Sequence, residues 1–166
     1  MKVYRNPAAF PRAWVVHEAI PIQRSDQIVT LIESATFDGR RTTFLKGNVP
    51  QLEKWSAPET VSLIEHQPGL VVIEADLARR GMVIDADTFY PGWVATVDGK
   101  PAPILEAYGC LRGVVVDAGR RRIEMRYRPK SVYWGAAFTA LGFLGAALLC
   151  ARAERKPPFA LQNWLL

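Results

Sequence analysis

The stretch YWGAAFTALGFLGAALLCA, residues Tyr133–Ala151, carries no charged side chain. As an α-helix that rises about 1.5 Å per residue, it would extend roughly 28 Å, close to the thickness of the hydrocarbon core of a bilayer. Tyr133 and Trp134 stand at its start, where aromatic side chains are typical of a membrane interface. The stretch therefore predicts a transmembrane helix. The alternative is a buried helix of a water-soluble domain.

Basic residues flank this stretch on both sides. They are Arg126, Arg128 and Lys130 before it, and Arg152, Arg155 and Lys156 after it. The net charge of the 166 residues is +5. Basic side chains beside a bilayer follow from membrane topology and from the attraction of anionic lipid. Because the sequence contains no nucleic-acid recognition motif, we expect no nucleic-acid partner. We interpret the positive charge as an adaptation to a lipid bilayer.

Short strands with alternating apolar residues dominate the sequence before this helix. Turn signals such as Pro68-Gly69 and Asp98-Gly99 separate them. The last two strands are expected to pair with each other around Ala118-Gly119. The pattern predicts a mainly β protein, an antiparallel β-sandwich with one short helix, followed by a single C-terminal transmembrane α-helix. The predicted strands are Arg12–Val16, Thr42–Leu45, Thr60–Gln67, Leu70–Leu77, Met82–Asp85, Trp93–Val97, Lys100–Leu105 (an edge or irregular strand, because of its prolines), Leu111–Val116 and Arg121–Tyr127.

The short helix is predicted at Ser25–Ser34, where Ser25 can cap the first turn. Its apolar face is expected to pack on a sheet, and it comprises Ile28, Val29, Leu31 and Ile32. His17 is interpreted as a strand-end residue and His66 as a solvated turn residue. Cys110 and Cys150 fall in the sandwich and in the span, so no disulfide between them is expected.

These elements divide the chain into three parts. We expect a β-sandwich over residues 1–129, a transmembrane helix over 130–152 and a short tail over 153–166. The first residues, MKVYRNPAAFPRAW, lack the apolar core of a secretory signal. A sandwich outside the cytoplasm would therefore need other spans to carry it there, from a longer polytopic protein or a split gene. The alternative is a domain that stays inside.

Carboxylates are the first candidates for chemistry. Asp85 and Asp87 fall on one face of a strand and could act as a pair, or bind a metal with Asp76 and Asp98. The sequence favours a simpler interpretation, in which these aspartates are solvated at turns and strand edges. It also contains no nucleophile–base pair, metal-ligand spacing or glycine-rich phosphate loop. We therefore expect no catalytic residue, no metal and no cofactor.

Three further groups are candidates for binding. Tyr90 and Trp93 could stack on a sugar, although packing in the core and at a turn is the commoner role of such residues. Basic residues near the span could bind phosphate groups of lipid or of an anionic polymer, or could serve only topology and solvation; they are Arg122, Arg126 and Arg128, together with Arg120, Arg121 and Lys130. Small residues on the span could let another helix approach; they are Gly135, Thr139, Gly142 and Gly145.

Four segments in this order resemble the C-terminal region of the bacterial YfhO-type membrane proteins. They are NPAAFPRAWVV (residues 6–16), FDGRRTTFL (37–45), DTFYPGWVATVDGKPAPIL (87–105) and GRRRIEMRYRPKSVYWG (119–135). The Tyr-Pro-Gly-Trp turn, the Asp-Gly hairpin and the Arg-Pro step before the last helix are the specific parts. The resemblance covers nearly the whole chain up to about Ala151. The segment AYGC, residues 107–110, departs from the asparagine-containing pattern of the family.

The resemblance implies a relative of GT-C glycosyltransferases, which use a polyprenyl-phosphate sugar to glycosylate cell-envelope polymers. It places the β domain outside the cytoplasmic membrane, and on this resemblance alone we expect residues 153–166 to be a short cytoplasmic tail. The multispan part, with the acidic loop that would carry catalysis, is missing from this sequence, so no catalytic residue is transferred. The implied role is a non-catalytic accessory domain that positions a lipid-linked sugar or its acceptor beside other transmembrane helices. The alternative is an independent single-span module that binds an anionic glycopolymer, a lipid headgroup or a partner protein.

Overall fold

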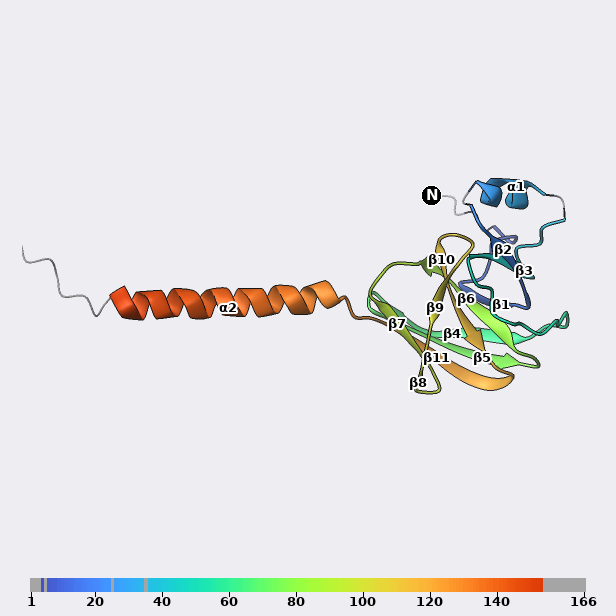
Figure 1. Ribbon diagram of the computed structural model, residues 1–166. Helices are drawn as coiled ribbons and strands as arrows, with labels where there is room; N and C mark the ends of the chain where they lie inside the picture. Colours follow the sequence, from blue (N-terminus) through green and yellow to red (C-terminus); the bar gives the residue numbers. More distant parts are fainter. Residues whose placement is uncertain (1–3, 5, 25, 35, 154–166) are drawn as a thin grey trace, which may run out of the picture. The chain divides into compact units, whose positions relative to one another are not determined.

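The computed structural model describes residue 4 and residues 6–24, 26–34 and 36–153 (Figure 1). The chain divides into two compact units between Arg128 and Pro129. The first unit holds all the strands and the short helix α1, and the second holds the helix α2. The predicted tail, apart from Ala153, lies outside the described residues.

The first unit contains a six-stranded sheet with the order β1-β6-β10-β9-β3-β2. Its neighbouring strands are antiparallel, except that β2 and β3 run parallel. The strands are β1 (Ala13–Val16), β2 (Glu18–Ile22), β3 (Thr42–Lys46), β6 (Gly81–Thr88), β9 (Ile104–Ala107) and β10 (Leu111–Val116).

A five-stranded antiparallel sheet has the order β4-β5-β11-β7-β8. The chain changes sheets at Pro103, which separates β8 from β9. The predicted single strand Lys100–Leu105 is wrong, because Pro103 divides it into β8 and β9, and β9 lies inside the six-stranded sheet. The part that forms β8 does lie at an edge, because proline cannot donate a ladder hydrogen bond. The strands are β4 (Thr60–Gln67), β5 (Leu70–Leu77), β7 (Trp93–Val97), β8 (Lys100–Ala102) and β11 (Gly119–Tyr127).

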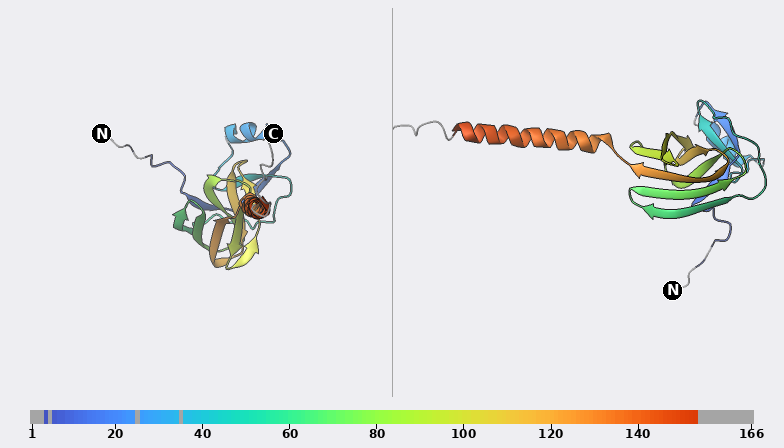
Figure 2. Two further views of the ribbon diagram at one scale, coloured as in Figure 1. Left: turned by 90° about the vertical axis from the view of Figure 1, so that its left-hand side faces the viewer. Right: turned by 90° about the horizontal axis from the view of Figure 1, so that it is seen from below.

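The main core lies between the two sheets, which form separate layers in Figures 1 and 2. Ile73 of β5 and Ile123 of β11 meet Val83 of β6 there, and all three side chains are fully buried. Alternation explains this arrangement, since every second residue of a strand points to the same face. The predicted antiparallel β-sandwich is confirmed.

A second apolar cluster covers the outer face of the six-stranded sheet. It includes Met82 and Ile84 of β6, and the aromatic rings of Phe44 and Tyr108, 5.6 Å apart between centroids, pack in the same region. The Tyr108 hydroxyl donates a hydrogen bond to the carbonyl of Gly39 at 2.7 Å. This bond fastens the 36–41 loop over the sheet, so both faces of the six-stranded sheet are covered.

One prediction about strand pairing is wrong, and one strand was not predicted. The strands β10 and β11 do not pair with each other, because the turn at Ala118 passes the chain from one sheet to the other. A turn signal marks a change of direction but does not specify which sheet receives the next strand. The strand β2 was not predicted, because Pro21 and the exposed Glu18 interrupt the alternation of apolar residues that marks a strand. Its parallel pairing with β3 also gives no hairpin signal.

The helix α1 (Gln27–Glu33) exists but does not pack as expected. None of its residues is buried, and Val29 and Ile32 are 59% and 58% exposed. Asp26 occupies the N-cap position without a side-chain cap bond, and the predicted cap Ser25 lies outside the described residues. The prediction that this apolar face packs on a sheet is therefore wrong for Val29 and Ile32, whereas Ile28 and Leu31 are half-buried and Ile28 lies against Gly109.

The helix α2 (Lys130–Ala153) is long and apolar enough to cross a membrane. Its Lys130–Arg152 part has a mean hydropathy of 1.7 over the most apolar window, and none of that window is buried within the described structure. A core helix of a water-soluble domain would be largely buried, so the exposure of this apolar surface favours the predicted transmembrane helix.

Candidate functional site

Four charged or titratable side chains gather at one end of the sandwich. Asp85 and Asp87 come from β6, Arg112 from β10 and His66 from β4. Asp85 lies directly opposite Arg112 in the antiparallel register, and the register shifts between Leu111 and Arg112. Such a bulge re-aims side chains at the end of a strand. We call these four residues the ionic cluster.

Arg112 is the centre of the ionic cluster and is only 2% exposed. Its Nη2 lies 3.0 Å from Oδ2 of Asp85 and donates a hydrogen bond to Oδ2 of Asp87 at 2.7 Å. Its guanidinium carbon lies 3.9 Å from the centroid of the Trp93 ring. An arginine side chain stays charged when buried, so two carboxylates and an aromatic face compensate for its lost hydration.

This compensation is incomplete. Nε and Nη1 of Arg112 are buried and have no hydrogen-bond partner among the described residues. Oδ2 of Asp85 also makes no hydrogen bond there, because its contact with Arg112 lacks the required geometry. A buried polar group that lacks a partner costs about 1–3 kcal/mol. The sandwich therefore maintains a costly arrangement at this end.

The two aspartates of the cluster respond to it in opposite directions. Burial raises the pKa of Asp85 to about 6, although the charge of Arg112 opposes the change. Burial also acts to raise the pKa of Asp87, but the hydrogen bond from His66 and the charge of Arg112 outweigh it, so this pKa is lowered. Nε2 of His66 lies 2.8 Å from Oδ2 of Asp87. Different environments thus shift the pKa values of Asp85 and Asp87 in opposite directions, although the two carboxylates are neighbours on one strand face.

The expectation of solvated aspartates is wrong for Asp85, which is 2% exposed. His66, expected in solvent, is a member of the cluster. Asp98 lies in the β7–β8 turn, at the other end of β7 from Trp93, and accepts hydrogen bonds from Arg121 and the backbone of Arg122. In the part of the chain that the structure describes, no three His, Cys, Asp or Glu residues are placed to hold a metal ion. The metal alternative for these aspartates therefore has no geometric basis there.

An aromatic rim, consisting of Tyr90, Trp93 and Tyr127, adjoins the ionic cluster through the contact of Trp93 with Arg112. The Trp93 and Tyr127 rings lie 5.6 Å apart between centroids, and Tyr127 lies 6.5 Å from Tyr90. Trp93 is half-buried against Arg112, whereas Tyr90 is 60% exposed and Tyr127 38% exposed. Trp93 thus packs and Tyr90 remains accessible. The alternation of Ile123, Met125 and Tyr127 in the sequence predicts that these three residues share one strand face, but nothing in the sequence marked Tyr127 as part of a site.

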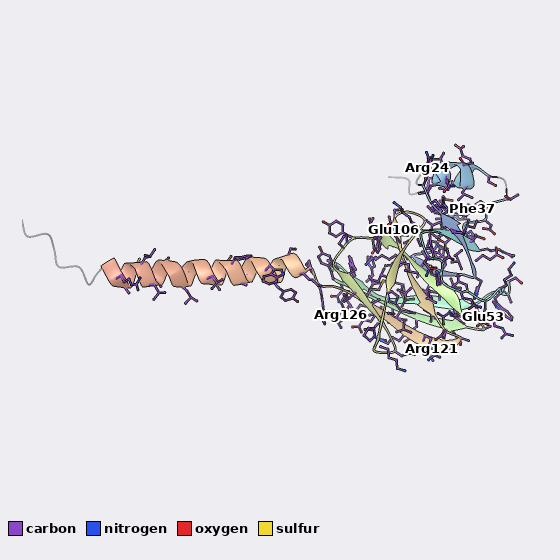
Figure 3. The ribbon with its side chains drawn as sticks, in the orientation of Figure 1. Arg24, Phe37, Glu53, Glu106, Arg121 and Arg126 are labelled. Carbon is purple, nitrogen blue, oxygen red and sulfur yellow. The ribbon has the colours of Figure 1, made fainter. Side chains whose placement is uncertain are left out.

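The basic candidates on and after β11 differ in their pairing. Arg122 lies 3.6 Å from Glu74, and Arg126 pairs with Glu124 on its own strand. Figure 3 labels Arg121 and Arg126 toward the two ends of β11. The side chain of Arg128 is exposed and forms no ion pair within the described residues. Lys130 is likewise exposed and forms no ion pair there, so no carboxylate of the described residues competes with a phosphate ligand at Arg128 or Lys130.

The small residues of α2 face open space. A Cβ atom added at Gly135, Gly142 or Gly145 would meet no atom within 4 Å. The Thr139 hydroxyl donates a hydrogen bond to the Gly135 carbonyl at 2.9 Å, within the helix. The described structure therefore leaves this predicted helix-packing face uncovered. Cys110 and Cys150 are free.

A hollow of about 570 Å³ lies beside Trp55 and was not predicted. Trp14, Arg40 and Arg41 line it, with His17 and Glu59 on its wall. His17 is not merely a strand-end residue, because it is 7% exposed and its ring nitrogens contact the Glu59 carboxylate at 2.7 Å and the Glu53 carbonyl at 2.8 Å. No sequence signal linked His17 to Glu59, since the two residues are far apart in the chain.

No family model, curated protein or solved structure matches this chain. The fold and the site define its class as a β-sandwich protein with one helix long and apolar enough to cross a membrane. A buried ionic cluster with an aromatic rim marks one end of the sandwich. Chemically, this arrangement is suited to fix the positions of side chains, because the Arg112 guanidinium is itself enclosed.

Proposed function

We propose that the chain is a single-pass anchored, non-catalytic domain of a YfhO-type cell-envelope glycosylation protein in the cytoplasmic membrane. The sandwich lies outside, where it positions a lipid-linked sugar or its acceptor beside other transmembrane helices. The four sequence segments that resemble this family support the proposal. They include the Pro91-Gly92 turn that precedes Trp93 and the Arg128-Pro129 step that precedes α2.

One observation carries the proposal: β11 ends at Tyr127 and α2 begins at Lys130. Only Arg128 and Pro129 connect them, and an extended chain spans at most about 3.6 Å per residue. The end of β11 therefore stays within about 11 Å of the first residue of the helix. If α2 crosses the bilayer, this connection keeps the sandwich at the membrane surface, where lipid-linked sugars are used.

A positioning role also fits the ionic cluster. Asp85 has the most perturbed carboxylate, but it is buried opposite Arg112. A general acid or base must come within hydrogen-bond reach of a substrate. The cluster instead supports Trp93 from inside the sandwich, so we assign it to positioning.

Topology provides the first test. Single cysteines at Lys100 and Gln162 are introduced in a Cys110→Ser, Cys150→Ala background. Lys100 is exposed and avoids the positive φ of the neighbouring Gly99. In intact cells, we expect a membrane-impermeant thiol reagent to label only Lys100→Cys, whereas lysed cells should label at both positions. Labelling only at Gln162→Cys would place the sandwich in the cytoplasm and overturn the proposal.

The glycosylation role has its own test. We expect deletion of the gene to remove one sugar modification from the envelope polymers, and expression of the full chain to restore it. Asp85→Asn should also restore the modification, because the domain is proposed to position rather than to react. An unchanged glycan profile after deletion would exclude the role in glycosylation.

The hollow beside Trp55 favours a second candidate, an independent module that binds an anionic glycopolymer. Arg40 and Arg41 line this hollow, and arginine suits the recognition of phosphate and carboxylate. We expect poly(glycerol phosphate) to change the tryptophan fluorescence of the full chain in nanodiscs, and Arg40→Ser/Arg41→Ser to reduce the change. A neighbouring gene that encodes many spans would favour the first candidate instead.

A further inference from the structure

We infer that the aromatic rim, together with Arg128, docks into the headgroup layer of an anionic bilayer, and that Arg112 holds the rim in position for this contact. The inference rests on the membrane anchoring in the proposed function, but it does not require glycosylation or a particular side of the membrane. Neither the sugar platform nor the packing role expected from the sequence includes this contact.

The first argument is the exposure of the rim. Tyr90 and Tyr127 are 60% and 38% exposed, and Val94, the neighbour of Trp93, is 47% exposed. A tyrosine side chain combines an apolar ring with a polar hydroxyl, which suits the interface between hydrocarbon and water. The other end of β7, by contrast, is the polar Asp98-Gly99 turn, where Arg121 and Asp98 form an ion pair.

The second argument is that the rim is held in place before any contact is made. The Arg112 guanidinium stacks on Trp93, which packs against Tyr127. Two backbone bonds fix the same region: the N–H of Tyr127 donates to the Gly69 carbonyl at 3.0 Å and the N–H of Arg128 to the Gly92 carbonyl at 2.6 Å. A surface that is already ordered loses little conformational entropy when it binds.

The third argument concerns charge and connection. Arg128 is exposed, and Arg126 lies opposite Val94 in the ladder. Cationic side chains are attracted to anionic lipid headgroups. Only two residues separate Tyr127 from the first residue of α2. The rim is therefore the part of the sandwich that chain connectivity brings to a bilayer when α2 spans it.

The test uses the full chain in nanodiscs, with Cys110→Ser and Cys150→Ala. A nitroxide is attached at Val94→Cys beside the rim, or at Lys100→Cys at the other end of the β7–β8 hairpin. With phosphatidylglycerol in the nanodisc, we expect the Val94 nitroxide to be shielded from a water-soluble nickel chelate and accessible to oxygen. The Lys100 nitroxide should be accessible to the chelate. Equal chelate access at both positions would overturn the inference.

Variants identify the residues responsible. Tyr90→Ser should reduce the shielding at Val94, and Tyr90→Ser/Tyr127→Ser should abolish it. Tyr4→Ser is the matched control, because Tyr4 is 86% exposed and not part of the rim, and it should leave the shielding unchanged. Nanodiscs of phosphatidylcholine alone should shield less. Retained shielding in the double variant would contradict the role of the rim.

The role of Arg112 has a separate readout. Arg112→Lys keeps the charge but loses the planar group that stacks on Trp93. We expect a more mobile nitroxide at Val94 and weaker shielding, with an unchanged spectrum at Lys100. An unchanged Val94 spectrum in a folded variant would show that Arg112 does not hold the aromatic rim in position.

The same samples distinguish a glycan surface from a lipid surface. If the Val94 nitroxide is unshielded by lipid and becomes immobile when poly(glycerol phosphate) is added, the rim binds polymer and the inference is wrong. Failure of the glycosylation test alone leaves the lipid contact standing, because nanodiscs contain neither sugar donor nor acceptor.

Discussion

Two buried pairs of titratable side chains in the sandwich differ in how completely their polar atoms are hydrogen-bonded. In the pair of His17 and Glu59, both ring nitrogens of His17 contact acceptors, and the second oxygen of Glu59 accepts the N–H of Ala78 at 2.6 Å. In the pair of Asp85 and Arg112, two guanidinium nitrogens have no partner within the described residues. Both pairs are less than a tenth exposed.

The difference shows that burial of charge serves two purposes here. The His17–Glu59 pair fastens the 53–59 segment to β1, and its complete hydrogen bonding explains its presence as structure. The Asp85–Arg112 pair is more costly than structure alone requires, and it adjoins the exposed aromatic rim. We therefore expect the two pairs to respond differently when they are broken.

The largest effect is expected for Arg112→Met. This variant leaves the carboxylate of Asp85 buried without its cationic partner, and removal of one member of a buried pair costs about 3–5 kcal/mol. The free energy of unfolding of the full chain in detergent, measured with urea near pH 8, should fall by that amount.

The double variant Asp85→Leu/Arg112→Met is the control. Replacement of a buried ion pair by apolar residues is often neutral or stabilising, so most of the lost stability should return. A double variant as unstable as Arg112→Met would show that the packing of Arg112 on Trp93, rather than the unpaired charge, determines the cost.

The next effect concerns pH. Asp85 has a pKa of about 6 in the folded protein and an ordinary value of 3.8. The folded protein therefore holds a proton more readily than the unfolded chain between these values, so the contribution of Asp85 to stability falls as the pH rises through this window. Relative to Asp85→Asn, the wild type should lose about 2 kcal/mol between about pH 4 and pH 7.

Measurement of both proteins across the window cancels the contributions of groups that they share. Asp87 acts in the opposite direction, since its lowered pKa makes it stabilising at neutral pH and less so as the pH falls. Parallel stability curves for the wild type and Asp85→Asn would show that Asp85 is not protonated more readily in the folded state.

Much of the fold could be predicted, because alternation and turn residues act locally. The Thr60–Gln67 and Leu70–Leu77 strands have the predicted bounds, and Ile123 and Met125 face the core as their spacing indicates. The pairing of the strands was harder to predict from the sequence. The alternating residues of β10 and β11 suit either sheet, so the sequence could not show that the chain crosses between sheets at Ala118.

The site was harder to predict, because its residues meet only through the register of distant strands. Asp85 and Asp87 were identified as a pair, but nothing local to Arg112 indicated that a bulge would turn it toward them. The nearby Trp93 was recognised as aromatic and close to a turn, yet its contact with Arg112 depends on the closeness of the two sheets. Burial, rather than residue type, raises the pKa of Asp85 and leaves nitrogen atoms of Arg112 without hydrogen-bond partners.

The His17–Glu59 pair should show a smaller effect than Arg112→Met. In Glu59→Gln, the side-chain amide keeps its shape and can still accept the N–H of Ala78, but it loses its charge toward His17. The free energy of unfolding should fall by about 1–3 kcal/mol, the usual cost of a compromised buried hydrogen bond. A loss as large as that of Arg112→Met would contradict the distinction between the two pairs.

The smallest effect is expected for the exposed ion pair of Arg80 and Asp117, which adjoins the 53–59 segment because the carbonyl of Arg80 accepts the N–H of Glu53 at 2.9 Å. Arg80 lies 2.6 Å from Asp117, and its Nε donates a hydrogen bond to the Gln51 carbonyl. The side chains of Arg80 and Asp117 are 42% and 67% exposed. Because water screens such a pair, Asp117→Asn should change the free energy of unfolding by less than about 1 kcal/mol. If it costs as much as Glu59→Gln, attachment of the segment rather than burial of the charge determines the contribution of each pair.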